Sequence, residues 1–218
     1  MTPPVKTRSY DNSGRAAAAR ETRRAVVCAA HDLFLENGYV GTTLAAIAER
    51  AGVSVQTVYA QFGSKPAIVK QIVDEAIAGD DEPIAIVDRP SVLAQIAEPD
   101  PQKRIRMHAR DVAERQQRLD AIDRVIRSAA QSDPAMRAQL ERGLADVRFG
   151  MTQMAELYAS RDELSVDVET ASQRVVALMA PELYWRTVSD SGWTLEQYAE
   201  WIGELMAASI LKPARRRR

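Results

Sequence analysis

The chain has 218 residues, of which 46% are hydrophobic and 27% are charged, a composition typical of a folded protein with one large domain or two small ones. Ten glycines and ten prolines are too few for a disordered or fibrous chain, and no stretch approaches the roughly 18 apolar residues of a membrane-spanning helix. The N-terminal residues lack the apolar core of a secretory signal, and the single Cys28 cannot form an internal disulfide bond. These features predict a protein of the reducing cytoplasm with no membrane partner.

The net charge of −1 conceals a division along the chain. Residues 1–70 carry nine Lys and Arg against five Asp and Glu, whereas residues 71–211 carry 15 against 25. The last seven residues add five positive charges, four of them in the run Arg215–Arg218. A basic N-terminal part beside an acidic remainder indicates that only the first part meets a polyanion. The tail is assigned no site, because runs of like charge are usually solvated.

Helical periodicity dominates the sequence and no run of alternating or β-branched residues predicts a strand, so we expect an all-α fold. The first helix is predicted over residues 15–37, where apolar side chains recur at helical spacing and Gly38 supplies the stop. Further helices are predicted over residues 44–51, 55–62 and 66–78. Ser54 and Ser64 are the expected N-caps, because each hydroxyl can accept from a free N–H of the following turn.

Residues 79–101 are acidic and rich in proline, and we interpret them as a connection with one short helix after Ser91. Asp100 and Asp133 each precede a proline, the arrangement of N-cap and first helical residue that starts a helix. The helices that follow are predicted over residues 101–130, with an interruption near Leu119, and over 134–159.

Two helices are predicted to close the fold, over residues 167–189 and 195–211. Pro181 lies inside the first of them and should kink or divide it. Thr194 and Gln197 have the spacing of a capping box for the second.

Residues 44–59 have the composition of two short helices that cross at a steep angle. Such a pair needs a small residue where the backbones approach, which Ala48 supplies, and a glycine able to adopt a positive φ at the turn, which Gly52 supplies. The inward-facing apolar residues are Ile47, Val53 and Val58. The pattern therefore predicts a helix-turn-helix over about residues 43–62, which would place its second helix in the DNA major groove.

A stretch of about fifty residues around this segment resembles the N-terminal domain of the TetR family of bacterial transcriptional repressors. The matching residues are Ala29, Phe34, Gly38-Tyr39, Thr42-Thr43, Ile47-Ala48, Ala51-Gly52-Val53-Ser54, Val58-Tyr59, Phe62 and Ser64-Lys65. A weaker resemblance, to the C-terminal dimerisation segment of some members, is carried by Pro181-Glu182-Leu183-Tyr184 and Gly192-Trp193. Residues 79–166 carry no family motif.

The resemblance implies a flexible basic arm over residues 1–14, a DNA-binding domain over 15–64 and a connecting helix over 65–78. The implied phosphate contacts are Thr43, Tyr59 and Lys65, and the side chains implied to face the groove are Gln56, Thr57 and Gln61, with Ser54 and Val55 beginning the same helix. A glutamine can pair bidentately with adenine. The family often has glycine in place of Gln56 and histidine in place of Gln61, so an unusual base preference is expected. For Tyr59 the alternative is packing on the preceding helix, and the arm could add contacts through Lys6, Arg8, Arg15 and Arg20.

The resemblance also implies that residues 79–211 form a ligand-binding and dimerisation domain, followed by the basic tail over 212–218. Because one helix-turn-helix reads only a few base pairs, we expect a homodimer on a palindromic operator of double-stranded DNA. The apolar stripes that predict an interface through the last two helices are Leu195, Tyr198, Ile202, Leu205 and Ile210, with Val175, Leu178 and Met179. Some of this apolar surface must face the monomer's own core, and the sequence does not divide it between core and interface. A small-molecule effector of unknown identity is expected to release the repressor. The candidate pocket residues are Met107, Phe149, Met151, Met154, Tyr184 and Trp185.

Two alternatives stay open. An architectural DNA-binding protein without an effector would use the same N-terminal domain. An enzyme could use Cys28 and His31, which lie three residues apart on one helical face, although no phosphate loop or nucleophile elbow accompanies them. We interpret Cys28 as a small core residue instead. No cofactor is expected, and His31 and His108 lack the spacing of metal ligands.

Overall fold

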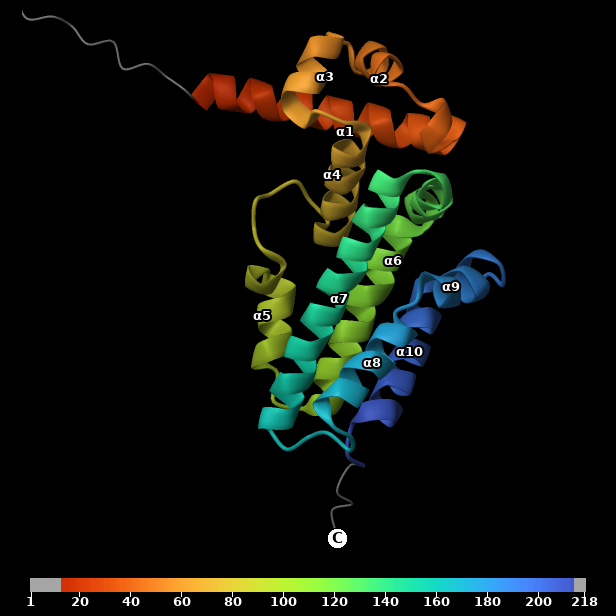
Figure 1. Cartoon of the computed structure of the whole chain (residues 1–218). Coiled ribbons are helices and arrows are strands. Elements are labelled where there is room, and N and C mark those ends of the chain that lie inside the picture. The colour runs from red at the N-terminus through yellow and green to blue at the C-terminus, as the bar shows by residue number, and fades with distance from the viewer. Residues whose placement is uncertain (1–12, 214–218) are drawn as a thin grey trace, which may run out of the picture. The chain divides into compact units, whose positions relative to one another are not determined.

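The structure, a computed structural model, describes residues 13–213, and in this range it is helical, with one isolated bridge between Leu164 and Leu211 in place of a sheet. The prediction of an all-α fold is confirmed. The elements are α1 (Ser13–Gly41), α2 (Leu44–Ala51), α3 (Val55–Phe62), α4 (Lys65–Ala78), the 3₁₀ helix η1 (Ile86–Asp88), α5 (Pro90–Ala97), α6 (Pro101–Ser132), α7 (Pro134–Ser160), α8 (Val168–Leu178), α9 (Pro181–Tyr184), the π-helix η2 (Trp185–Ser189) and α10 (Leu195–Ile210) (Figure 1). Most of the predicted basic arm and the four arginines of the tail lie outside the described residues.

The chain divides into two compact units, residues 1–72 and 73–218, with the boundary inside α4. In the first unit α1 packs on α2, and α2 on α3. The core of this unit consists of fully or almost fully buried apolar side chains, namely Val26, Ala30, Phe34, Ile47, Ala48, Val58, Ile68 and Val69. Gly38 interrupts α1 with φ 68° and ψ 171°, so the predicted stop is confirmed even though the helix resumes as far as Gly41.

In the second unit α6 runs without a break from Pro101 to Ser132, so the predicted interruption near Leu119 is wrong. The sequence there contains no glycine or proline, and three pairs of oppositely charged residues four apart support the helix. These pairs are Arg115–Asp111, Arg124–Asp120 and Arg127–Asp123. Asp100 and Asp133 cap α6 and α7 as predicted, each accepting from two N–H groups of the following turn.

Pro181 divides the predicted helix over residues 167–189. The helix α8 ends at Leu178, Pro181 is the first residue of α9, and the backbone then widens into the π-helix η2. The capping box at the start of α10 is confirmed: Thr194 accepts from the backbone of Gln197, whose side chain accepts from Thr194 N–H at 2.8 Å.

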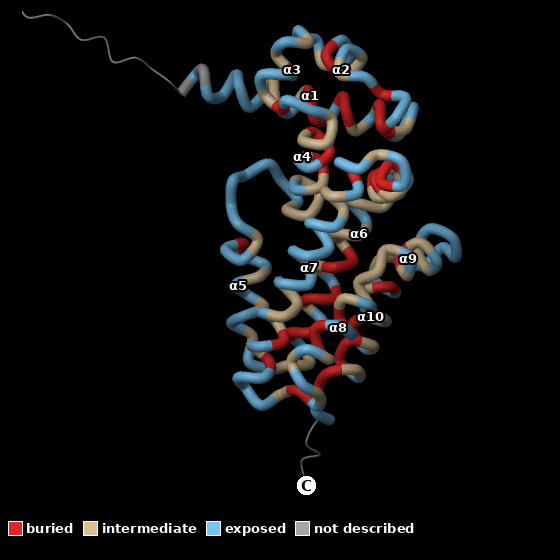
Figure 2. Tube along the Cα trace, in the orientation of Figure 1, coloured by how far each residue is buried: buried red, intermediate tan, exposed pale blue. Residues whose placement is uncertain are grey.

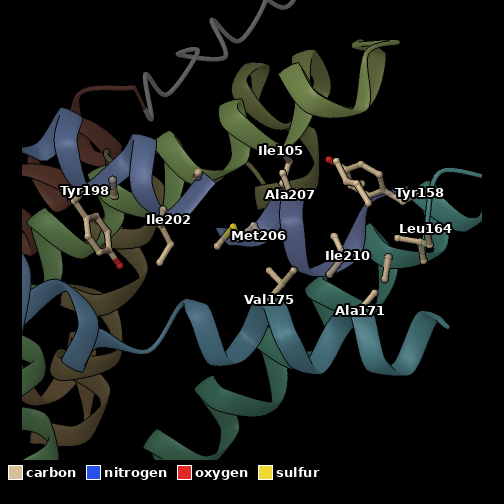
Figure 3. Packing of buried hydrophobic residues seen from close by; sticks show 14 of the residues in the cluster. Ile105, Tyr158, Leu164, Ala171, Val175, Tyr198, Ile202, Met206, Ala207 and Ile210 are labelled. Atoms are coloured by element: carbon tan, nitrogen blue, oxygen red, sulfur yellow. The ribbon is translucent and has the colours of Figure 1, made fainter. Parts of the chain in front are cut away.

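The core of the second unit lies where α10 packs between α6 and α8 (Figure 3). Tyr198, Ile202 and Ile210 of α10 and Val175 of α8 are all 0% exposed within this single chain. These four residues therefore form the part of the predicted stripes that faces the monomer's own core, and a dimer interface through the last two helices stays a prediction. The predicted stripe residues that keep partial exposure are Leu178, Met179, Leu195 and Leu205.

A buried ion pair ties the two ends of the α6–α7 hairpin together. The Arg104 side chain is 2% exposed, and its Nη1 donates to Glu163 Oε2 at 2.6 Å. Arg104 Nε also donates to the carbonyl of Glu98 at 2.9 Å, and the guanidinium lies 4.7 Å from the ring centroid of Tyr158. Burial raises the pKa of the Tyr158 hydroxyl.

The helix α5 contrasts with this core. It consists largely of apolar residues, yet none of its eight residues is buried, as the pale and tan tube in Figure 2 shows. Its position after Ser91 was predicted approximately, since it begins at Pro90. Among residues 13–213, no helix combines the length and apolar character needed to span a membrane.

Candidate DNA-binding interface

The start of α2 is built by two consecutive threonines with different partners. Thr42 is 1% exposed, and its hydroxyl contacts the carbonyls of Leu33 and Gly38 at 3.0 and 2.8 Å, which ties the end of α1 to α2. Thr43 is exposed and caps α2, accepting from Ala46 N–H at 3.1 Å. Because the Thr43 oxygen acts as acceptor in this cap, its hydroxyl hydrogen can point outward toward an acceptor such as a phosphate.

The turn between α2 and α3 depends on Gly52. This residue adopts φ 69° and ψ 29°, a left-handed conformation, and its N–H donates to the carbonyls of Ala48 and Glu49. Ser54 then caps α3 by accepting from Thr57 N–H at 3.1 Å, and the two hydroxyl oxygens lie 2.9 Å apart. Both the predicted turn glycine and the predicted N-cap are therefore confirmed.

Two faces of α3 differ in burial. Val58 is 0% exposed and Phe62 is 9% exposed, and they anchor the helix in the core. The opposite face carries Gln56, Tyr59 and Ala60, all exposed, with Tyr59 at 56%. Residues four apart lie next to each other on one helical face, so Gln56 and Ala60 form a continuous strip beside Tyr59. The helix contains no charged residue, and the strip offers one amide, one phenol and one methyl group.

Among the other residues predicted on α3, Gln61 lies differently. Its side chain is half-buried, and Oε1 is inaccessible to solvent and has no hydrogen-bond partner. Arg23 of α1 covers this end of the helix, donating to the Gln61 carbonyl at 3.4 Å and to Gln71 Oε1 at 2.7 Å, with its guanidinium 4.4 Å from the Phe62 ring. Val55 and Thr57 are half-buried. The family resemblance placed Gln61 at the groove, and its contact with DNA stays a prediction. Ala60, which was not among the predicted site residues, is exposed one turn after Gln56.

Lys65 has a structural role in addition to carrying a positive charge. Its ammonium group donates to the carbonyls of Tyr39 and Thr42 at 2.7 and 2.8 Å, and it lies 4.3 Å from the centroid of the Tyr39 ring. These bonds satisfy carbonyls at the end of α1, so the residue stabilises the junction of α1, α2 and α4. A phosphate contact by Lys65 stays a prediction, and a substitution there would perturb the fold as well as any DNA contact.

Arg50, an exposed residue of α2, has its charge compensated by a neighbouring carboxylate. Arg50 of α2 forms a two-pronged ion pair with Glu36 of α1, with distances of 3.1 and 2.9 Å. The hydrogen bonds from Arg50 hold the pKa of Glu36 below its ordinary value, and those to Glu36 raise the pKa of Arg50. The pair joins the two helices at the surface.

Cys28 is exposed, so its interpretation as a core residue is wrong. It precedes the buried Ala30 by two residues, and a rotation of about 100° per residue turns it away from the buried face of α1. His31 Nδ1 lies 3.4 Å from Asp32 Oδ1, and no hydrogen bond joins His31 to Cys28. Within residues 13–213, no cluster of three or more His, Cys, Asp or Glu side chains could hold a metal ion.

The six residues predicted to line a ligand pocket do not share one environment. Phe149 is 69% exposed, because it precedes the buried Tyr158 by nine residues and so lies on the opposite face of α7. Tyr184 is 4% exposed and belongs to the core, where its ring packs edge-on against that of Tyr198 at 5.3 Å. Met107 is half-buried, and Met151, Met154 and Trp185 are half-buried and pack against the core cluster.

The structure has a surface groove of about 280 Å³ between α6 and α10, which none of the six candidates lines. The lining residues are Arg106, Arg110, Glu114, Leu195, Glu196, Ala199 and Glu200. Beneath it the two helices approach closely at Gly203, where a side-chain methyl would lie 3.2 Å from Ala109 Cβ. The mixed charges of its rim distinguish this groove from the apolar pocket that the sequence predicted.

The geometry of residues 42–65 is that of a helix-turn-helix DNA-binding protein. Residues 27–72 match the family model described as bacterial regulatory proteins, tetR family. The chain is 44% identical over 48 residues to the uncharacterized HTH-type transcriptional regulator YdeS of Bacillus subtilis, a match that spans 22% of this chain and 24% of that protein.

Two solved structures resemble the whole fold. A putative TetR-family transcriptional regulator from Syntrophomonas wolfei has a TM-score of 0.71 at 17% identity, covering 87% of this chain and 94% of that one. NalD of Pseudomonas aeruginosa, the secondary repressor of the MexAB-OprM multidrug efflux pump, has a TM-score of 0.66 at 22% identity, covering 90% and 99%. Residues 27–72 therefore belong to the TetR family of bacterial regulatory proteins, and the chain as a whole has the fold of TetR-family regulators.

Proposed function

We propose that the protein is a transcriptional regulator that binds a palindromic operator as a homodimer and represses transcription until a small molecule releases it. The observation that carries the DNA-binding part is the exposed strip on α3. A rigidly capped helix presents Gln56 and Tyr59 outward on a domain of the TetR family. Repression is favoured by the likeness of the whole fold to that of NalD, a repressor.

The two contact types expected on this strip differ in what they supply. The Gln56 amide can donate to and accept from one adenine edge, which gives sequence preference. The Tyr59 hydroxyl on the strip, and the Thr43 hydroxyl at the start of α2, suit phosphate oxygens, which fix the position of the helix and give affinity to any sequence. Tyr59 is the better phosphate probe than Lys65, because removal of its hydroxyl breaks no internal hydrogen bond that the structure shows.

For the dimer we propose the outward faces of α8 and α10. The inward stripe of each helix is already buried, so the residues available to a partner are those that keep exposure. On α10 these include Trp201, Leu205 and Ala208, and on α8 they include Val176 and Ala177. Sedimentation should show a dimer at micromolar concentration, and a monomer there would contradict the proposal.

Selection of bound sequences from a random DNA pool tests the function. A palindrome with half-sites about one helical turn apart supports a specific regulator, whereas recovery of no motif would support the architectural alternative. On the selected operator, Gln56→Ala should cost roughly tenfold in affinity and relax the preference at one position of each half-site. Tyr59→Phe should weaken binding to all sequences alike and leave the salt dependence nearly unchanged, because the hydroxyl group carries no charge. If both variants behaved alike, the division into base and phosphate contacts would be wrong.

A further inference from the structure

The strip on α3 contains one residue whose chemistry allows a single kind of base contact. Ala60 is exposed, lies one helical turn after Gln56 and ends in a methyl group with no donor or acceptor. Among the groups that base pairs present in the major groove, the only apolar one is the C5-methyl of thymine. We propose that Ala60 determines operator specificity by packing against a thymine methyl group in each half-site, an inference that rests on the proposed DNA-binding function.

The residues around Ala60 support a contact with the base pairs, because they fix the direction in which its methyl group points. The buried Val58 and Phe62 on either side of it in sequence fix the rotation of α3, so Ala60 cannot turn into the core without pulling them out. Cβ atoms four residues apart on a helix are about 5–6 Å apart. Gln56 and Ala60 can therefore reach neighbouring base pairs, and a small side chain at position 60 lets the helix approach the floor of the groove closely.

Gln61 does not compete for this role. Its Oε1 is shielded from solvent, and the Arg23 guanidinium, held by Gln71 and stacked on Phe62, covers the adjoining backbone. To reach a base edge Gln61 would have to leave this packed position. The specificity of this helix therefore comes from Gln56 and Ala60, and Gln61 contributes to the packing of α3 against α1 and α4.

The test replaces thymines of the selected operator one at a time by deoxyuridine, which removes only the C5-methyl group. For the unmodified protein, one position per half-site should lose about fourfold in affinity, the value of one buried methyl group. In Ala60→Gly the same replacement should have no effect at that position, while the other thymines behave as before. Ala45→Gly is the matched control, because it removes an exposed methyl from α2 at a similar cost in helix stability.

The outcomes separate this inference from the proposed function. If a palindrome is bound but Ala60→Gly keeps every deoxyuridine effect of the unmodified protein, the inference is overturned and the regulator survives. If selection returns no motif, both fail together. Gln61→Ala should leave the deoxyuridine profile unchanged, and a change confined to one thymine would move the contact from Ala60 to Gln61. Circular dichroism of each variant confirms that it is folded.

Discussion

The two units of this chain reach their folds by different routes. In the first unit, capping residues and glycines close in sequence determine where each short helix begins and ends, as at Thr43, Gly52 and Ser54. In the second unit, long helices are held by contacts between residues far apart, such as the Arg104 to Glu163 pair, 59 positions apart. The family model matches only the first kind of region, at residues 27–72.

This difference teaches where each unit is vulnerable. Substitution of one capping residue or turn glycine should lower the free energy of unfolding only modestly, because neighbouring contacts still hold the helix. A buried ion pair fails more severely, because the partner that remains is left charged in the interior. The three tryptophans, Trp185, Trp193 and Trp201, all lie in the second unit, so their fluorescence follows that unit while circular dichroism follows both.

The largest effect is expected for Arg104→Ala. It leaves the Glu163 carboxylate, 13% exposed, without its cation, and should lower the free energy of unfolding of the second unit by about 3–5 kcal/mol. Tryptophan fluorescence in a denaturant titration measures it. Arg186→Ala is the control, because Arg186 is 83% exposed in its pair with Asp190 and should change stability little. Equal effects of the two substitutions would show that Arg104 is not the anchor.

A smaller effect should appear as pH dependence at His108. This imidazole is 7% exposed with Nε2 unpartnered, and burial, helped by the nearby Arg115 cation and opposed by Asp111, lowers its pKa from 6.5 to about 4. The unfolded chain then binds the proton more readily, so stability falls as pH drops from 6.5 toward 4. Between pH 7 and pH 5 the unmodified protein should lose about 2 kcal/mol more than His108→Gln does. Denaturant titrations at both pH values measure this loss. If the unmodified protein and His108→Gln lost the same free energy of unfolding between pH 7 and pH 5, the burial of a neutral His108 would be contradicted.

The smallest effect compares one glycine from each unit. Gly52→Ala should destabilise the first unit by about 1–2 kcal/mol, because a residue with a side chain disfavours the left-handed backbone conformation. A steric clash does not contribute, since the new methyl group meets no atom within 4 Å. Gly143→Ala, inside α7 and equally unobstructed, should stabilise the second unit by up to about 1 kcal/mol. Thermal unfolding measures the direction of both changes: circular dichroism follows both units, and tryptophan fluorescence follows the second unit alone. A stabilising Gly52→Ala would refute the role of its backbone conformation.

The sequence alone was sufficient for features that depend on neighbours along the chain. The caps at Ser54, Asp100 and Asp133 and the break at Pro181 follow from backbone chemistry within a few residues, and the structure has each of them. The existence of apolar faces on the helices was equally predictable, because it requires only periodicity.

Tertiary structure alone decided which partner each face meets. The stripe of Tyr198 and Ile202 could have served a dimer or a core, and it forms the core because α6 and α8 cover it. Cys28 faces outward and the Gln61 amide oxygen inward for the same reason: helical spacing places side chains on a common face, but only the packing of other helices determines which face is buried.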